Sequence, residues 1–355
     1  MKGLILSGGK GTRMRPLTYT SAKQLIPVAN KPVLVYGIEA IVAAGIPDIA
    51  IIVSPETGSE IRQAIGDGSR FGANVTYIEQ DAPRGLAHAV LTAESFLRDS
   101  PFVMYLGDNL LQHGITPLVE EYRSIDCNSE ILLTKVPNPS QFGVAELDGK
   151  GRVVKLTEKP PHPKSDLALV GVYMFDETIF DAAKAIKPSK RGELEITDAI
   201  QWLLDNGRSV HPHVVKGWWK DTGKIEDMLE ANRTVLDTFE RDVRGTITNS
   251  QIEGKVIVED GAEIIDSVVR GPSIIGRDAR VNHAYVGPYT SIGSRCSLEH
   301  CEVENSIVLE NSTIAHVNGR IEASLIGKNV KIGRTQRKPA AYRFMVGDNS
   351  EVGIT

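Results

Sequence analysis

A 17-residue repeat in the last third of the chain constrains the fold more than any other feature. Short β-branched apolar pairs recur from Gln251 onward, separated by small and polar residues. The apolar positions form three interleaved rows, which are Val258, Ile275 and Ile292; Ile264, Val281 and Leu298; and Val269, Val286 and Val303. Along the chain, the successive positions Val258, Ile264, Val269 and Ile275 are 6, 5 and 6 residues apart. This is the spacing of three short strands per coil. One coil cannot bury its apolar row alone, so the repeat favours a stacked β-helix over a β-sandwich of regular hairpins.

Up to about residue 240 the chain has a different hydrophobic pattern, in which strand-like and helix-like segments alternate. The apolar run GLILS is followed by helical spacing in residues 32–45, and DIAIIVSP and PFVMYLGDN are apolar enough for strands covered on both faces. This βαβα order predicts an α/β fold, with a Rossmann-like, mostly parallel sheet and helices on both faces. The helical stretch 224–242 would close this part, so we expect two domains, 1–242 and 243–355.

Composition excludes several classes of function. The 355 residues carry a net charge of −5, which gives no general affinity for nucleic acid or for an acidic membrane surface. The three cysteines, Cys127, Cys296 and Cys301, show no CxxC spacing, and no apolar run is long enough to span a bilayer. These features predict a cytoplasmic protein that binds neither nucleic acid nor membranes.

The first strand runs into a loop that is rich in glycine and positive charge, GGKGTRMRP. Ligands bind at the carboxyl edge of parallel sheets, and glycines let backbone N–H groups come close to a phosphate. The loop lacks the Walker pattern GxxxxGK[ST], and Met14 stands where the dinucleotide fingerprint GxGxxG needs its third glycine. The residues of the loop alone therefore fit either a phosphate-binding loop or a simple turn.

A wider stretch, residues 6–32, resembles the signature GGxGTRLxPxTxxxxKxLxPVxxKP of the sugar-1-phosphate nucleotidylyltransferase family. Met14 replaces the usual Leu and keeps an apolar side chain. The segments QDAPRGLAHAV, LGDN, FGVAELD, LTEKP, VGVYMF, RGELEITDAI and WWKDTG follow in the family's order, up to about residue 225. The combination is most similar to the thymidylyltransferase subgroup in its long form, whose hexapeptide repeats imply a left-handed parallel β-helix.

The resemblance implies a nucleotidyl transfer. The phosphate oxygen of glucose 1-phosphate would attack the α-phosphorus of dTTP in line, giving dTDP-glucose and pyrophosphate. Arg13, Lys23 and Asp108 are the implied catalytic residues. Mg²⁺ would be held by Asp108 and Asp221, since this ion commonly takes one or two carboxylates together with phosphate oxygens. Ser7 has no motif-linked histidine, which favours direct displacement over a covalent intermediate.

The same motifs imply the residues that bind the two substrates. Gln80 would read the base, because its amide offers both the donor and the acceptor that the imide edge of thymine or uracil requires. The implied nucleotide-binding set is Leu6, Gly8, Gly9, Gly11, Gln80, Pro83 and Gly85. The implied sugar-phosphate set is Asn109, Gly143, Glu158, Lys159, Tyr173 and Arg191. Phe142 stands where many thymidylyltransferases have Tyr, which removes one hydroxyl contact to the sugar.

Several alternatives stay open at this point. UTP is an alternative to dTTP, and the dTDP-sugar could feed either cell-surface glycans or antibiotics and other secondary metabolites. The β-helix would assemble a homo-oligomer or regulate the enzyme, or it would add an acyltransferase site at His283. The segment NHAYVG departs from the acyltransferase pattern in its spacing and at Pro288, which favours a histidine that simply points out of a coil. Intact Arg13, Lys23 and Asp108 disfavour a non-catalytic regulatory subunit.

Overall fold

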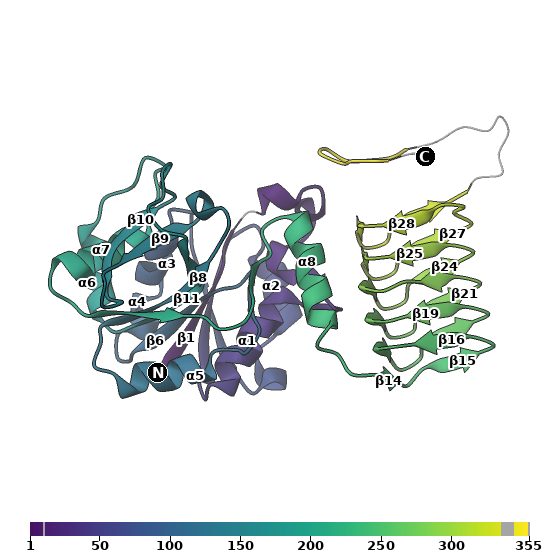
Figure 1. The fold of residues 1–355 in the computed structure, drawn as a ribbon, viewed down its shortest axis with the longest axis horizontal. Coiled ribbons are helices and arrows are strands. Elements are labelled where there is room, and N and C mark those ends of the chain that lie inside the picture. Colours follow the sequence, from purple (N-terminus) through teal and green to yellow (C-terminus); the bar gives the residue numbers. More distant parts are fainter. Residues whose placement is uncertain (10, 335–343, 354–355) are drawn as a thin grey trace. The chain divides into compact units, whose positions relative to one another are not determined.

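The computed structural model describes residues 1–9, 11–334 and 344–353 of the chain. These residues separate into two units, whose elements are labelled in Figure 1. The first unit consists of Met1–Lys10, Ala22–Leu25 and Val33–Asp221, and the second of Gly11–Ser21, Ile26–Pro32 and Thr222–Thr355. The functional boundary expected at residue 242 stays a prediction.

A sheet is the centre of the first unit, and nine strands of the described residues belong to it. Its neighbouring strands β6, β1, β4 and β5 are parallel, as the βαβα order predicts. Strand β11 continues the sheet antiparallel to β6 and pairs with β8 and β9, so an antiparallel part adjoins the parallel one. The strands are β1 (Lys2–Ser7), β4 (Asp48–Val53), β5 (Asn74–Glu79), β6 (Phe102–Leu106), β8 (Ser129–Lys135), β9 (Gly143–Leu147), β10 (Val153–Glu158), β11 (Leu167–Phe175) and β12 (Val210–Val214).

Helices cover both faces of this sheet, because successive residues of a strand point to opposite sides. Leu4 and Leu6 of β1 pack into one apolar core with α3, α6 and α7, whereas Ile5 packs into a second core with α1, α2 and α5. The helices are α1 (Val33–Ala43), α2 (Gly58–Ile65), α3 (Leu86–Thr92), α4 (Glu94–Leu97), α5 (Thr116–Ser124), α6 (Thr178–Ala185) and α7 (Ile196–Asp205). The predicted Rossmann-like sheet with helices on both faces is therefore confirmed.

The second unit contains a parallel β-helix built from three sheets (Figure 1). The first sheet is β14 (Asp242–Val243), β17 (Val256–Val258), β20 (Ser273–Ile275), β23 (Thr290–Ile292), β26 (Ile307–Val308) and β29 (Leu325–Ile326). The second is β15 (Thr246–Thr248), β18 (Glu263–Ile265), β21 (Arg280–Asn282), β24 (Ser297–Glu299), β27 (Thr313–Ala315) and β30 (Lys331–Gly333). The third is β16 (Gln251–Glu253), β19 (Val268–Arg270), β22 (Tyr285–Val286), β25 (Glu302–Glu304) and β28 (Arg320–Glu322).

The register of these sheets reproduces the rows found in the sequence. Val258 pairs with Ile275 and Ile275 with Ile292, and the other two rows pair in the same way. All nine side chains of the three rows have an exposed fraction of 0%. The repeat thus forms a stack of coils around one apolar core, which rules out the β-sandwich and is consistent with the left-handed form that the resemblance implies.

One corner of the coils carries a column of histidines. His283, His300 and His316 all have positive φ angles, and their rings stack with centroids 4.9 Å and 5.1 Å apart. The His283 side chain is 50% exposed and its Nε2 lies 3.8 Å from a carboxylate oxygen of Asp266. This placement agrees with a histidine that points out of a coil corner.

The second unit also contains helix α8 (Ile225–Leu236) and a small hairpin of β2 (Pro27–Val28) and β3 (Lys31–Pro32). Asn232 of α8 is fully buried. Its Oδ1 accepts hydrogen bonds from the Ala29 N–H at 2.8 Å and the Ser291 hydroxyl at 2.7 Å, and its Nδ2 donates to the Tyr289 carbonyl at 3.1 Å. One amide therefore joins the helix, the hairpin and a coil of the β-helix.

Candidate active site

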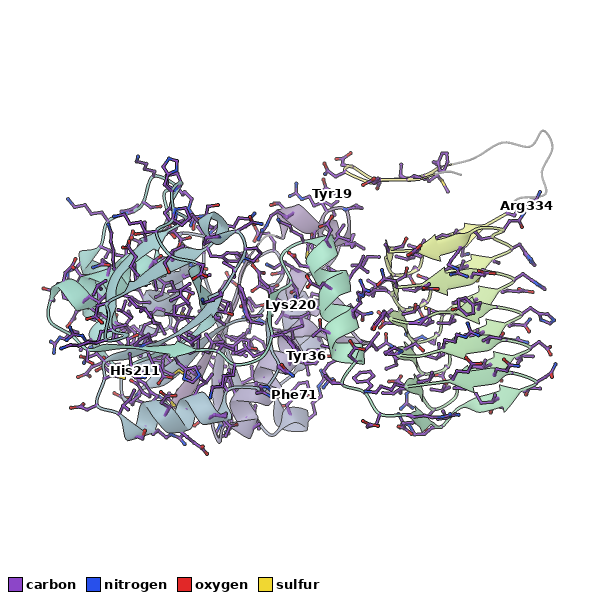
Figure 2. All side chains as sticks on the ribbon, in the orientation of Figure 1. Tyr19, Tyr36, Phe71, His211, Lys220 and Arg334 are labelled. Carbon is purple, nitrogen blue, oxygen red and sulfur yellow. The ribbon has the colours of Figure 1, made fainter. Side chains whose placement is uncertain are left out.

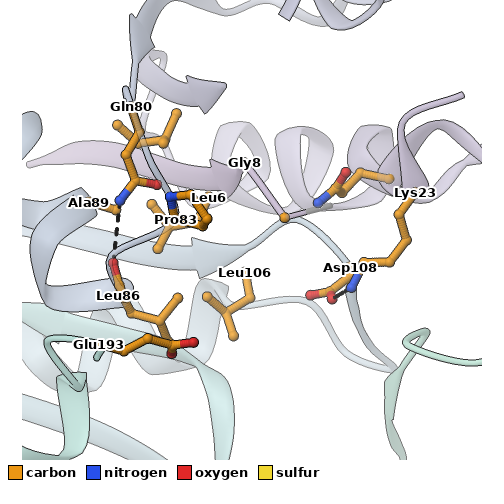
Figure 3. Close-up of a pocket in the computed structure, with 14 residues that line it drawn as sticks. Leu6, Gly8, Lys23, Gln80, Pro83, Leu86, Ala89, Leu106, Asp108 and Glu193 are labelled. Carbon is orange, nitrogen blue, oxygen red and sulfur yellow. Dashed lines mark hydrogen bonds and ion pairs between the residues drawn. The ribbon is translucent and has the colours of Figure 1, made fainter. Parts of the chain in front are cut away.

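A pocket of about 240 Å³ lies where strands β1, β5 and β6 of the first unit end (Figure 3). Ligands of α/β sheets bind at this carboxyl edge. The pocket is lined by eight of the predicted site residues, which are Leu6, Gly8, Gly9, Lys23, Gln80, Pro83, Gly85 and Asp108. The structure therefore brings most of the predicted nucleotide-binding set together with two predicted catalytic residues.

The close approach of two parallel strands puts Asp108 at this edge. Leu6 pairs with Leu106 across β1 and β6, and the Gly107 N–H then donates to the Leu6 carbonyl at 3.0 Å. A Cβ atom on Gly107 would stand only 3.0 Å from that same oxygen. Gly107 thus lets the chain turn next to β1 and present the following carboxylate to the pocket.

Lys23 and Asp108 form an ion pair in which both side chains are largely buried. Burial alone would raise the pKa of Asp108, but the Lys23 ammonium and a hydrogen bond from Asn109 Nδ2, at 2.9 Å, hold it below its usual range. Lys23 lies in a short turn, Lys23–Leu25, whose start is anchored by the Ala22 N–H donating to Glu60 Oε2 at 2.6 Å. A charged carboxylate and a charged amine are therefore held together at the pocket.

Asp221 comes to the same region through a two-stranded pairing of β7 (Asn109–Leu111) and β13 (Trp219–Asp221). The register sets Asp221 opposite Asn109, the residue that follows Asp108. The buried Asn109 side chain stabilises this arrangement, since its Oδ1 accepts from Trp219 Nε1 at 2.6 Å and from the Gly171 N–H at 3.2 Å. The predicted role of Asn109 in sugar binding stays a prediction; the observed bonds make it a positioning residue.

Gln80 lies across the pocket, on the side away from Lys23 (Figure 3). Its Nε2 is 2.9 Å from His88 Nδ1 and 3.4 Å from the Gly85 carbonyl, which fixes the orientation of the amide. Its Oε1 faces Gly8, because a Cβ on that glycine would lie 3.4 Å from the oxygen. Gly85 itself has φ 104°, and a Cβ there would stand 2.4 Å from the Leu194 carbonyl oxygen.

The predicted sugar-phosphate residues Gly143, Glu158, Lys159 and Arg191 gather in one cluster. Gly143 pairs with Glu158 across β9 and β10, while Lys159 Nζ and Arg191 Nη2 lie 3.5 Å and 3.3 Å from Glu158 Oε1. Thr197, which sequence reasoning missed, donates to Glu158 Oε2 at 2.7 Å. Glu158 is therefore the centre of the cluster, because Lys159, Arg191 and Thr197 all contact its carboxylate.

Two members of the predicted sugar set have engaged or buried side chains. Arg191 also contacts carboxylate oxygens of Glu193 at 3.2 Å and Glu195 at 2.9 Å, so three acids offset its charge. Tyr173 is buried, its ring lies 5.9 Å from that of Phe175, and burial and the negative charge of Glu158 raise its pKa. Their assigned roles stay predictions.

The remaining predicted residues, Gly11 and Arg13, belong to the second unit. Gly11 has φ 60° and its carbonyl accepts a hydrogen bond from the Thr18 hydroxyl at 2.7 Å. Arg13 lies in the short turn Thr12–Met14, and the guanidinium of Arg15 lies 4.7 Å above the ring of Tyr19, which is labelled in Figure 2. The Arg15 charge is thus engaged in a cation–π contact.

Sequence reasoning missed several residues of the pocket. Gln24 and Glu193 line it, and His88 orients Gln80. Gln24 follows Lys23 directly, and His88 lies three residues after Gly85 at the start of α3, so both lie inside segments that carry the resemblance. Glu193 likewise lies inside such a segment, RGELEITDAI, although only the fold brings it to the pocket.

The comparisons with known proteins agree with this site. The model of the Nucleotidyl transferase family matches residues 2–238. A glucose-1-phosphate thymidylyltransferase from Streptomyces antibioticus is 54% identical, over 100% of this chain and 99% of its own. The low-salt glycan biosynthesis nucleotidyltransferase Agl11 from Haloferax volcanii is 48% identical over 100% of both chains.

A solved structure from Bacillus anthracis, assigned as a glucose-1-phosphate thymidylyltransferase and crystallised with sucrose, is similar with a TM-score of 0.62 and 37% identity. It covers 65% of this chain and 94% of its own. Among the described residues, we find no helix that is both long and apolar enough to cross a membrane. The family match spans the nine-stranded sheet of the first unit, the glycine loop and the Lys23–Asp108 pair. The chain therefore belongs to the Nucleotidyl transferase family.

Proposed function

We propose that this chain is a glucose-1-phosphate thymidylyltransferase, which joins dTTP and glucose 1-phosphate into dTDP-glucose with release of pyrophosphate. The observation that carries the proposal is the single pocket in which Gly8, Gln80, Lys23 and Asp108 meet at the carboxyl edge of the sheet. The full-length similarity to a Streptomyces thymidylyltransferase supports the choice of nucleotide and sugar.

The nucleotidyl transfer mainly requires that the two substrates are positioned and that the charge of their phosphates is neutralised. The backbone N–H groups of Gly8 and Gly9 bind the triphosphate, and Lys23 stabilises charge on the α-phosphate or on the leaving pyrophosphate. Arg13 supplies a second, permanently charged donor for the same phosphates. The sugar phosphate oxygen is then the nucleophile, pyrophosphate is the leaving group, and no enzyme side chain is nucleotidylated.

Asp108 and Asp221 fit a Mg²⁺ ion. Both offer hard carboxylate oxygens, and the β7–β13 pairing keeps the two segments adjacent. When bound, Mg²⁺ supplies charge neutralisation for the phosphates. The chain's own part is to keep Asp108 ionised at neutral pH, which the contacts with Lys23 and Asn109 favour.

Gln80 reads the pyrimidine. His88 and the Gly85 carbonyl engage the amide Nε2, so the oriented amide presents Oε1 on the Gly8 side as an acceptor for the N–H of the base edge. The sugar binds beside Gly143 and Glu158, where the glycine backbone hydrogen-bonds to the hexose and the Glu158 carboxylate accepts hydrogen bonds from its hydroxyls. Lys159 is the cation for its phosphate, because three carboxylates already offset the charge of Arg191.

A pyrophosphate-release assay over a matrix of nucleoside triphosphates and sugar 1-phosphates tests the proposal. We expect the highest kcat/KM with dTTP and glucose 1-phosphate, a requirement for Mg²⁺, and loss of turnover in Asp108→Asn. Asp166→Asn is the matched control, since Asp166 is exposed and pairs only loosely with Lys135, at 3.7 Å. A preference for UTP, or normal turnover in Asp108→Asn, would overturn the assignment. Assembly into a homo-oligomer stays a prediction that light scattering of the purified chain checks.

A further inference from the structure

Glu130 is a carboxyl group inside the first unit that the proposed reaction does not use. Its side chain has an exposed fraction of 0%, and neither carboxyl oxygen has a hydrogen-bond partner among the residues that the structure describes. A buried polar group without a partner is costly, so nearly all such groups in proteins are satisfied. The position of Glu130 therefore calls for a partner that the described residues do not supply.

The surroundings of Glu130 are built by three elements. It is the second residue of β8, and the sheet register sets it beside His211 of β12 and Met174 of β11. Helix α5 covers this side with Glu121, whose Oε1 lies 3.0 Å from His211 Nε2 and whose Oε2 lies 2.7 Å from His213 Nδ1. His211 is labelled in Figure 2, on the side of the unit where Figure 1 labels α5.

The donor atoms of this cluster have the spacing of metal ligands. One atom each of Glu121, Glu130 and His213 lies within 4.8 Å of the other two. Imidazole nitrogen together with carboxylate oxygen is a donor set for Zn²⁺ and related divalent ions. We propose that Glu121, Glu130 and His213 bind a divalent cation of the Zn²⁺ class, for which Glu130 is the buried anchoring ligand.

This centre is separate from the catalytic pocket. Strands β6 and β8 both run antiparallel to β11, so they point the same way. Glu130 and Val103 both pair with Met174, at the amino ends of their strands, whereas Asp108 follows the carboxyl end of β6. The strand from Val103 to its end at Leu106 alone spans about 10 Å, and Asp108 lies in the turn beyond it. The cation would therefore stabilise the packing of α5 against β8 and β12 and take no part in nucleotidyl transfer.

Equilibrium dialysis of the full chain against Zn²⁺ alone, followed by metal analysis, tests the site. We expect the wild type to bind a Zn²⁺ ion. The Glu130→Gln and His213→Gln variants should each bind this ion at least about tenfold more weakly than the wild type does. Asp108→Asn and His300→Gln are the matched controls, since they remove the catalytic carboxylate and the centre of the histidine stack, and both should keep this ion. A Zn²⁺-induced rise in melting temperature, present in the controls and absent in the two ligand variants, is the second readout.

Each outcome decides the proposal. Wild-type protein that binds no ion, or ligand variants that bind as tightly as wild type, would overturn it. Loss of the ion in Asp108→Asn or His300→Gln alone would also overturn it, because the ion would then lie elsewhere. If Glu130→Gln does not fold by circular dichroism, His213→Gln decides, because the His213 side chain is partly exposed at the edge strand. None of these results depends on thymidylyltransferase activity, so failure here leaves the proposed function intact.

Discussion

The ammonium group of Lys23 forms an ion pair with the carboxylate of Asp108, although 85 residues separate them in the sequence. The pair joins the turn after the glycine loop to the end of β6, the strand next to β1. A cation for phosphate and a carboxylate for a metal are thus in contact before any substrate arrives. The Lys23 ammonium keeps the largely buried Asp108 carboxyl group ionised.

Replacement of Lys23 by Met should damage both catalysis and stability. Loss of the cation removes charge stabilisation worth at least about 100-fold in kcat. It also leaves Asp108 buried without its partner, which should lower the free energy of unfolding by about 3 kcal/mol. Pyrophosphate release and urea denaturation measure the two effects. Lys135→Met is the control, because the Lys135 side chain is 75% exposed and should change neither quantity. A loss of stability with unchanged kcat would leave Lys23 only a structural role.

Gly85→Ala should disturb the base-binding side of the pocket. A Cβ at this position would stand 2.4 Å from the Leu194 carbonyl oxygen, and φ is 104°. We expect a loss of about 1–3 kcal/mol in stability and a higher KM for the nucleotide, with a smaller change for the sugar phosphate. Gly149→Ala is the matched control, because nothing lies within 4 Å of a Cβ there. Equal behaviour of the two variants in denaturation and kinetics would contradict the prediction.

Asn232→Leu should destabilise the second unit by about 2–4 kcal/mol, because it leaves the buried Ala29 N–H and Tyr289 carbonyl without their partner. Chemical denaturation followed by far-ultraviolet circular dichroism, which reports the strands of the β-helix, measures the loss. Asn232→Asp keeps the acceptor for Ala29 and Ser291 but sets a buried carboxylate oxygen against the Tyr289 carbonyl, so it should also destabilise the unit at neutral pH. Wild-type stability of both variants would show that the amide does not hold these three elements together.

Glu94 gives a pH-dependent contribution to stability. Hydrogen bonds from Lys184, at 2.7 Å, and from Arg98 hold its pKa below the usual range, against a smaller effect of burial. A carboxylate with a lowered pKa contributes above its unfolded pKa of about 4.3, and the contribution is lost as the pH falls through the folded pKa. Glu94→Gln should therefore cost about 0.5 kcal/mol at pH 7 and nothing near pH 3. Urea denaturation at both pH values checks this, and a pH-independent difference would refute it.

The thiol of Cys301 should resist alkylation. Burial, with a small added effect of Glu302, raises its pKa to about 11. At pH 8 only about one thiol in a thousand is then ionised, against about a quarter for an unperturbed cysteine. Iodoacetamide labelling followed by mass spectrometry should be at least about 100-fold slower in the native protein than after guanidinium denaturation. Rapid native labelling would mean that this coil opens.

The coils and the parallel strands could be predicted from the sequence because their signals are periodic. Val258, Ile275 and Ile292 share a register that the 17-residue step already encodes, and β1 contains the apolar run Leu4–Leu6. The resemblance, together with the rule that ligands bind at the carboxyl ends of parallel strands, predicted one common site for Gly8, Lys23, Gln80 and Asp108.

Other features have no periodic signal. Strands β7 and β13 have three residues each, so their pairing depends on Trp219 and Gly171 meeting Asn109 in space. Glu130 directly precedes the apolar residues of the strand SEILLTK, and a charged residue next to a strand's end is expected at the surface. Its burial arises only when β12 and α5 cover it, which is a tertiary effect.

The amide of Asn232 makes the hairpin before α1 depend on a coil that is more than two hundred residues away in the sequence. The Ala29 N–H is shielded from solvent only while α8 and the strand carrying Ser291 stay folded together. Its hydrogen–deuterium exchange rate thus reports the opening of the β-helix at a site near the start of the chain. The amide of this short hairpin should therefore exchange only as often as the β-helix opens.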